Sequence, residues 1–115
     1  MPIPTEITLH QQSRTLEIAF DDDAHFQLPA ELLRVYSPSA EVRGHGPGEE
    51  VLQVGKKNVC LTGVEPVGSY ALKLVFDDGH DSGLYTWEYL YKLGEHQKTL
   101  WQDYLRKMEE AGASR

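Results

Sequence analysis

Residues 16–28 read LEIAFDDDAHFQL, and this stretch decides the fold. Apolar residues alternate with polar or small ones over 16–20, which is typical of a strand with one buried face. The three aspartates at 21–23 interrupt the strand as a turn, and the alternation resumes over 26–28. The same period of two precedes it at 7–9. The pattern therefore predicts antiparallel hairpins.

The strand and its acidic turn recur further along the chain. The segment LEIAFDD at 16–22 aligns with LKLVFDD at 72–78, and the same offset relates Leu28 to Leu84. Two interpretations are open. The copies are two related half-sites, or strand alternation and Asp-rich turns produce the match by composition alone. Either interpretation favours a meander of strands with helices on one face.

Three helices are expected. Pro29 suits the start of the first, which covers 30–36. Thr86 is a suitable N-cap for the second, which Gly94 is expected to terminate. The third runs over about 95–111, with an apolar stripe for the sheet or for a partner. That stripe consists of Leu100, Trp101, Tyr104, Leu105 and Met108.

The remaining segments complete an α+β prediction. Residues 38–48 contain three glycines and two prolines, so we expect a long surface loop there. Two more strands are expected at 59–61 and 70–76, with a hairpin turn at 77–79. The predicted fold is one small antiparallel β-sheet with two short helices and a C-terminal helix packed on it. We expect a single domain over residues 1–115, with a core of about 4–105 and a disordered tail at 112–115.

Composition excludes several classes of function. The 115 residues contain 11 Lys and Arg against 18 Asp and Glu, a net charge of −7 that disfavours nucleic acid and anionic membranes. No apolar run approaches a membrane span, so a cytoplasmic location is expected. Cys60 is the single cysteine, which excludes an internal disulfide and a thiolate zinc cage.

Few residues carry a readable chemistry. None of the five histidines has a metal-binding spacing to another. His80 lies in the acidic stretch 77–82, where it either shares a cation with the carboxylates or is part of a polar turn. Arg34, Arg43 and His45 form a basic spot that either receives an anionic group or is a plain surface cluster.

Three segments carry a family resemblance. They are LLRVYSPSAE at 32–41, RGHG at 43–46 and FDDGHDSGLYTWEYL at 76–90. Together they resemble the gamma-butyrobetaine hydroxylase-like N-terminal domain family, over about residues 4–105. In the family's eukaryotic hydroxylases this domain precedes an iron- and 2-oxoglutarate-dependent oxygenase domain. There it binds a structural zinc through a Cys-x-Cys-x-x-Cys cluster and a later histidine.

The resemblance places those ligand positions on this chain residue by residue. The cysteine positions correspond to Ser37, Ser39 and Val42, and the histidine corresponds to His80. Serine is a poor zinc ligand and valine is none, so only His80 matches the family's ligand set. No cofactor is therefore expected.

The resemblance also bears on function. The chain contains no oxygenase domain, and the family has stand-alone bacterial members and relatives fused to P-loop ATPases of the iron–sulfur carrier type. This implies a non-catalytic accessory domain with a protein partner. The expected contact surface is the loop 37–48, which includes Arg43 and His45, together with the His80 turn, Arg34, Trp101 and Tyr104.

The alternative is a metal-binding protein linked to oxygenase or iron–sulfur metabolism. In it His80, with Asp77, Asp78 or Asp81, would hold iron or zinc in a site unlike the family's thiolate cluster.

Overall fold

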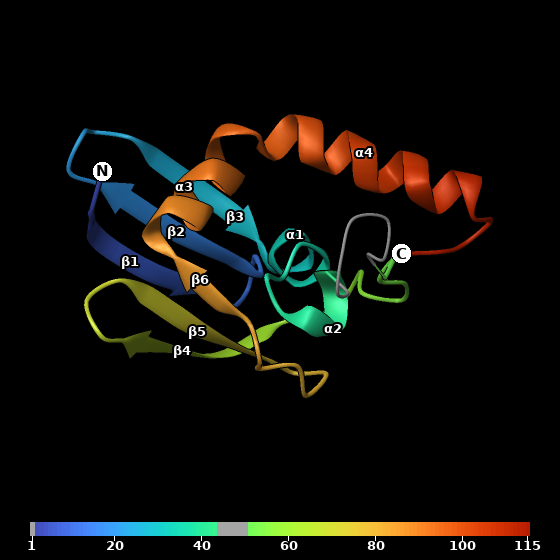
Figure 1. Ribbon diagram of the computed structural model, residues 1–115, viewed down its shortest axis with the longest axis horizontal. Helices are drawn as coiled ribbons and strands as arrows, with labels where there is room; N and C mark the ends of the chain where they lie inside the picture. The colour runs from blue at the N-terminus through green and yellow to red at the C-terminus, as the bar shows by residue number, and fades with distance from the viewer. Residues whose placement is uncertain (1, 44–50) are drawn as a thin grey trace.

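The computed structural model describes residues 2–43 and 51–115 and shows two three-stranded antiparallel sheets with helices beside them (Figure 1). One sheet has the strand order β1-β2-β3 and the other β4-β5-β6. The α+β class and the hairpins are thus confirmed, with two small sheets in place of one. The strands are β1 (Pro4–His10), β2 (Thr15–Phe20), β3 (His25–Pro29), β4 (Leu61–Val67), β5 (Ala71–Phe76) and β6 (Leu84–Thr86). The helices are α1 (Ala30–Val35), α2 (Ala40–Arg43), α3 (Trp87–Glu95) and α4 (Gln97–Glu110).

The two central strands have similar burial patterns because both have the same alternating sequence. Every second side chain is buried in β2 and over residues 72–76 of β5, where Ala71 is buried as well. Pairing keeps those side chains on one face: Leu16 lies opposite Leu28 of β3, and Leu72 lies opposite Tyr85 of β6. Each sheet therefore presents one apolar face to the interior.

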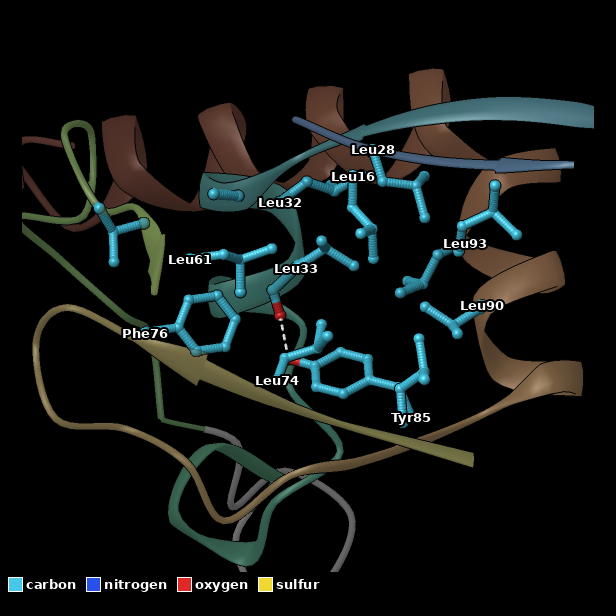
Figure 2. Close-up of a cluster of buried hydrophobic side chains, with 14 of the residues drawn as sticks. Leu16, Leu28, Leu32, Leu33, Leu61, Leu74, Phe76, Tyr85, Leu90 and Leu93 are labelled. Carbon is cyan, nitrogen blue, oxygen red and sulfur yellow. Dashed lines mark hydrogen bonds between the residues drawn. The ribbon is translucent and has the colours of Figure 1, made fainter. Parts of the chain in front are cut away.

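Side chains of both sheets meet in one core around α1. Figure 2 shows Leu16 and Leu28 of the first sheet and Leu74 of the second, with Leu33 of α1 between them. Every residue of α1 is buried. Tyr85 of β6 links the second sheet to α1, since its hydroxyl donates a hydrogen bond of 2.6 Å to the Leu33 carbonyl (Figure 2). Both sheets are thus packed through one short central helix.

Helix α3 begins as the sequence predicts but does not end as predicted. Thr86 is the N-cap, and its hydroxyl accepts a hydrogen bond of 3.1 Å from the Tyr89 amide. The helix continues through Gly94 to Glu95. Gly94 packs instead on Phe26, where a Cβ atom would lie 2.3 Å from the ring. The glycine therefore permits close contact between α3 and β3 and is not a helix stop.

Three other expectations differ from the structure. The strand expected at 59–61 is β4, which runs on to Val67; it is an edge strand, where Pro66 is tolerated. The loop expected at 38–48 contains α2, with Ser39 and Val42 buried, while residues 44–48 lie outside the described residues. The tail 112–115, expected to be disordered, is described and returns to α1.

Helix α4 lies along one side of the molecule, over α1 (Figure 1). Its buried residues Tyr104 and Met108 pack on Val35 of α1. Trp101 is half-buried at the edge of the main core. Within residues 2–43 and 51–115, the structure has no helix with the length and apolar character needed to cross a membrane.

Candidate functional site

The two acidic turns have the same backbone hydrogen bonds. In the first turn (Phe20–Ala24) and the second turn (Phe76–His80), the amide of the first residue donates to the carbonyl of the fifth, at 2.8 and 3.0 Å. The carboxylate of the third residue accepts from the amide of the fifth, at 3.0 and 3.1 Å. The fourth residue has a positive φ, 71° at Asp23 and 88° at Gly79. The repeat seen in the sequence is therefore present in the backbone.

The similarity extends to the strands that precede the turns. In each half, a register shift lies near the start of the first strand, between Pro4 and Glu6 in β1 and between Leu61 and Gly63 in β4. A helix follows directly on the third strand in both halves. Each half therefore has the same order of elements: two strands, an acidic turn, a third strand and a helix.

The side chains around the third residue of each turn differ. The second oxygen of Asp22 accepts a hydrogen bond of 2.6 Å from the Tyr91 hydroxyl. The second oxygen of Asp78 accepts from Arg34 Nε at 2.8 Å and from Lys56 Nζ at 2.6 Å. The Arg34 side chain is only 9% exposed. The second turn therefore carries a nearly buried ion pair where the first has a surface hydrogen bond.

The ion pair changes the acidity of Asp78. Burial raises the pKa of Asp78, but hydrogen bonds from Lys56, from the His80 amide and from Arg34 outweigh burial and lower the pKa to about 2. The carboxylate is therefore ionised at neutral pH and stabilises the buried guanidinium.

His80, the fifth residue of the second turn, points into a buried polar cluster. Its Nε2 lies 2.8 Å from Ser37 Oγ, and Ser37 Oγ also accepts from the Ser39 amide at 3.2 Å. The Ser39 and Ser82 hydroxyls lie 2.7 Å apart. Ser37 is 1% exposed and His80 is 5% exposed. We call Ser37, Ser39, His80 and Ser82 the serine–histidine cluster.

Gly83 lets the chain close over this cluster. A Cβ atom at this position would lie 2.5 Å from Ser37 Oγ and 3.2 Å from Pro38 Cδ. The segment that precedes β6 therefore packs closely on the segment between α1 and α2. The cluster fixes these two parts of the chain to each other.

The chain matches, over residues 7–91, the family described as Gamma-butyrobetaine hydroxylase-like, N-terminal. The chain belongs to this family. No protein with a curated description matches it. An NMR solution structure with 59% identity covers 100% of this chain and 90% of its own, at a TM-score of 0.87. A second NMR solution structure has 55% identity and a TM-score of 0.86, with coverage of 100% and 86%.

A crystal structure of a protein with lower identity is also similar to this chain. It is a protein of unknown function of the DUF971 family from Acidithiobacillus ferrooxidans, at 1.93 Å resolution. It shares 38% identity and a TM-score of 0.67 with this chain, and the match covers 79% of this chain and 91% of that one.

Three of the four positions that the family resemblance assigns to zinc ligands lie in one cluster, and the residues present on the four positions are poor zinc ligands apart from His80. Ser37, Ser39 and His80 are in one cluster, and Val42 is buried in α2, three residues after Ser39. Two hydroxyls and an aliphatic side chain replace three thiolates, and the Ser37 hydroxyl is hydrogen-bonded to the imidazole. Ser37 and Ser39 thus make hydrogen bonds at positions where the resemblance implies thiolate ligands.

The residues of the alternative metal site point to different partners. Asp77 accepts a hydrogen bond of 3.1 Å from the Cys60 amide, and Asp81 pairs with Lys73 at 3.6 Å. In the part of the chain that the structure describes, no group of three or more His, Cys, Asp or Glu side chains is placed to hold a metal ion.

The residues expected to form a contact surface are dispersed. Arg34 is buried in its ion pair, so the expected exposed basic spot does not include it. Arg43 is exposed, with its guanidinium 5.0 Å above the Tyr89 ring, and His45 lies outside the described residues. Tyr104 is 2% exposed and belongs to the interior, whereas half-buried Trp101 reaches the surface.

Sequence reasoning did not find a second ion pair, which centres on the buried carboxylate of Glu31 of α1. Arg115 donates to both carboxylate oxygens, from Nε at 3.0 Å and from Nη2 at 2.9 Å. The Tyr104 hydroxyl donates to the same carboxylate at 2.7 Å. Burial raises the pKa of Glu31, but the bonds from Arg115 and Tyr104 outweigh burial and hold the pKa below its usual value.

The sequence marks only one member of this pair. Glu31 is an acidic residue in the first turn of a helix whose other residues are mostly apolar. Its partner Arg115 lies 84 positions away, and no sequence spacing indicates that the two residues are in contact.

Proposed function

We propose that this family member is a non-catalytic accessory domain that binds a protein partner. The observation that carries the proposal is the closure of the serine–histidine cluster. Ser37 and His80 are a hydroxyl and an imidazole within hydrogen-bond reach, the arrangement that an activated nucleophile requires. Both are almost fully buried and are joined to their neighbours by hydrogen bonds. This burial supports a structural role for the pair in place of a catalytic one.

A concave surface beside α4 suits a partner. Trp101 lines a hollow of about 540 Å³ at the junction of α3 and α4, and Pro29 of β3 lines it as well. The remaining lining residues are Gly94, Glu95, Gln97 and Lys98. Tryptophan side chains in such hollows often supply much of the binding energy of an interface. The net charge of −7 favours a partner with a basic surface.

Site-specific photo-crosslinking tests the proposal. A photoreactive residue replaces exposed Lys98 beside the hollow in one variant. In the matched control it replaces exposed Glu65 on β4, an edge strand of the other sheet. In cells that naturally make the protein, we expect one defined protein adduct at position 98 and none at position 65. Absence of an adduct at position 98, or equal adducts at both positions, would contradict the proposal.

Elemental analysis separates this proposal from the metal-binding alternative. We expect protein purified without a metal-affinity step to contain far less than one equivalent of zinc or iron. Close to one equivalent, lost in the His80→Ala variant and dependent on pH, would instead support a metal site at the second turn. The same measurement on His10→Ala controls for a surface histidine outside that turn.

A further inference from the structure

Glu31 and Trp101 contact the guanidinium of Arg115, and Tyr104 contacts both of them, where α4 lies over α1. The Glu31 side chain is 7% exposed, and both of its oxygens face Arg115. The Arg115 guanidinium carbon lies 5.0 Å from the centre of the Trp101 ring. The Trp101 and Tyr104 rings are in contact, at 5.2 Å between centroids. Glu31 thus holds the guanidinium by charge and two hydrogen bonds, Trp101 holds it by a cation–π contact, and Tyr104 contacts Glu31 and Trp101.

Those three groups belong to helices, whereas Arg115 belongs to a tail. The tail turns back at Gly112, which has a φ of 62°, and the Ala113 amide donates to the Met108 carbonyl at 2.9 Å. A further backbone bond of 3.1 Å joins the Gly55 amide to the Ser114 carbonyl. The C-terminus lies close to the segment that precedes β4 (Figure 1). The guanidinium is therefore carried by a short segment with few bonds to the fold.

We propose that Glu31, Tyr104 and Trp101 form a guanidinium-binding site, which Arg115 fills and which takes an arginine side chain of a partner protein once Arg115 is displaced. The identity of the occupant as a partner residue rests on the proposed function. The site itself rests on its geometry. A buried carboxylate needs a paired cation, and two parallel N–H donors match its two oxygens.

The chemistry selects arginine over lysine. A lysine ammonium is a point charge that cannot donate in two parallel directions, and it stacks less well on an indole than a planar guanidinium does. The Tyr104 hydroxyl also donates to Glu31 Oε2 at 2.7 Å, and this bond helps to orient the carboxylate before a ligand arrives. The Arg115 side chain is 38% exposed, so the site opens to solvent where a ligand would enter.

A partner arginine alone is not enough to displace Arg115, so the partner must make further contacts. A residue tethered in the same chain competes at an effective concentration on the order of millimolar or above. A partner that also contacts the hollow beside Trp101 gains the additional binding that this competition demands. The site and the hollow share Trp101, so one partner segment can reach both.

Chemical rescue of Arg115→Ala tests the site. The probe is N-acetyl-arginine methylamide, followed by the NMR signal of the Trp101 indole N–H and by the thermal midpoint. We expect saturable binding to the variant, at least about tenfold tighter than to the wild type, where Arg115 competes. The lysine analogue of the probe is expected to bind at least about fivefold more weakly.

The control is Arg115→Ala combined with Glu31→Gln, which should not bind the probe. No saturable binding to Arg115→Ala, or equal binding to the double variant, would overturn the site. If Arg115→Ala does not fold, Arg115→Lys replaces it, and failure of the arginine probe to displace the lysine is the overturning result. Probe binding without a crosslink at position 98 would retain the site and reject the partner, and the reverse result would reject the site alone.

Discussion

The first turn and the second turn share a backbone but differ in what surrounds them. The first, Phe20–Ala24, ends in an alanine and passes directly into β3. The second, Phe76–His80, ends in a histidine that points into the serine–histidine cluster, and three further residues precede β6. The longer connection brings Ser82 to Ser39 and Gly83 to Ser37. One scaffold thus serves a surface hairpin in one half and an internal junction in the other.

The two turns keep their local bonds and differ in their contacts with distant segments. The backbone bonds of a turn depend on residues within five positions of one another, so both copies keep them. The partners of Asp22 and Asp78 come from distant segments, Tyr91 of α3 in one half and Arg34 of α1 in the other. The two halves therefore differ in their long-range contacts. Variants at equivalent positions of the two turns can measure this difference.

The largest expected effect is at the third residue of the turns. Asp78→Asn keeps an acceptor for the His80 amide but leaves the nearly buried Arg34 guanidinium without its carboxylate. We expect the free energy of unfolding to fall by about 3 kcal/mol. Asp22→Asn, the matched variant, loses a surface bond from Tyr91 and should cost clearly less. Urea denaturation followed by circular dichroism measures both, and equal losses would contradict the comparison.

The pH dependence of stability should follow the same carboxylate. The pKa of Asp78 is about 2 in the folded protein, below the ordinary value of 3.8, so its contribution is present above pH 4 and is lost as the pH falls toward 2. The loss should amount to about 2 kcal/mol. Denaturation at pH 5 and at pH 2 should therefore show a smaller decrease for Asp78→Asn than for the wild type. An identical decrease in both proteins would show that Asp78 is not the group responsible.

Removing the Ser37 hydroxyl tests the cluster that the first half lacks. Ser37→Ala takes away the atom shared by the bonds to His80 and to the Ser39 amide, in a site 1% exposed. The expected loss is about 2 kcal/mol in the free energy of unfolding. Ser13→Ala, which removes an exposed hydroxyl bonded to Thr15, is the control and should have little effect. A loss no greater than that of the control would mean that the cluster does not hold the junction.

The smallest expected effect is at the fourth residue. Gly79 has a φ of 88° with open space around it, so Gly79→Ala adds strain without a clash and should cost about 1 kcal/mol. Asp23 has a φ of 71°. Asp23→Gly relieves strain but loosens the unfolded chain, and should change stability by about 0.5 kcal/mol or less. Thermal denaturation gives both values, and a larger effect at Asp23 would reverse the expected order.

Short-range patterns predicted most of the elements. The period of two located β2 and β5, and Thr86 located the start of α3. The full length of β4 was missed because Gly63 and Pro66 resemble loop residues. An edge strand tolerates both, but a strand's place in a sheet is not a local property. The burial of the segment before α2 was missed for the same reason, since its serines are satisfied by residues more than 40 positions away.

The candidate site was predicted in part. The family resemblance marked Ser37, Ser39, Val42 and His80, and the structure brings the two serines and the histidine into one cluster. It did not mark Glu31 or Arg115, whose contact follows from the packing of α4 on α1 and the turn at Gly112. Tyr104 was expected at a contact surface, but its aromatic ring is needed to fill the space beside Val35.

The amino-acid sequence by itself determined the α+β class, the hairpins, the repeated acidic turn and the family, because these depend on periodicity and on residues close together in the chain. Only the tertiary structure decided that the strands form two sheets, that Arg34 is buried on Asp78 and that Arg115 covers Glu31. Those contacts join residues 44 and 84 positions apart. Packing around α1, and not any local preference, brings them within hydrogen-bond distance.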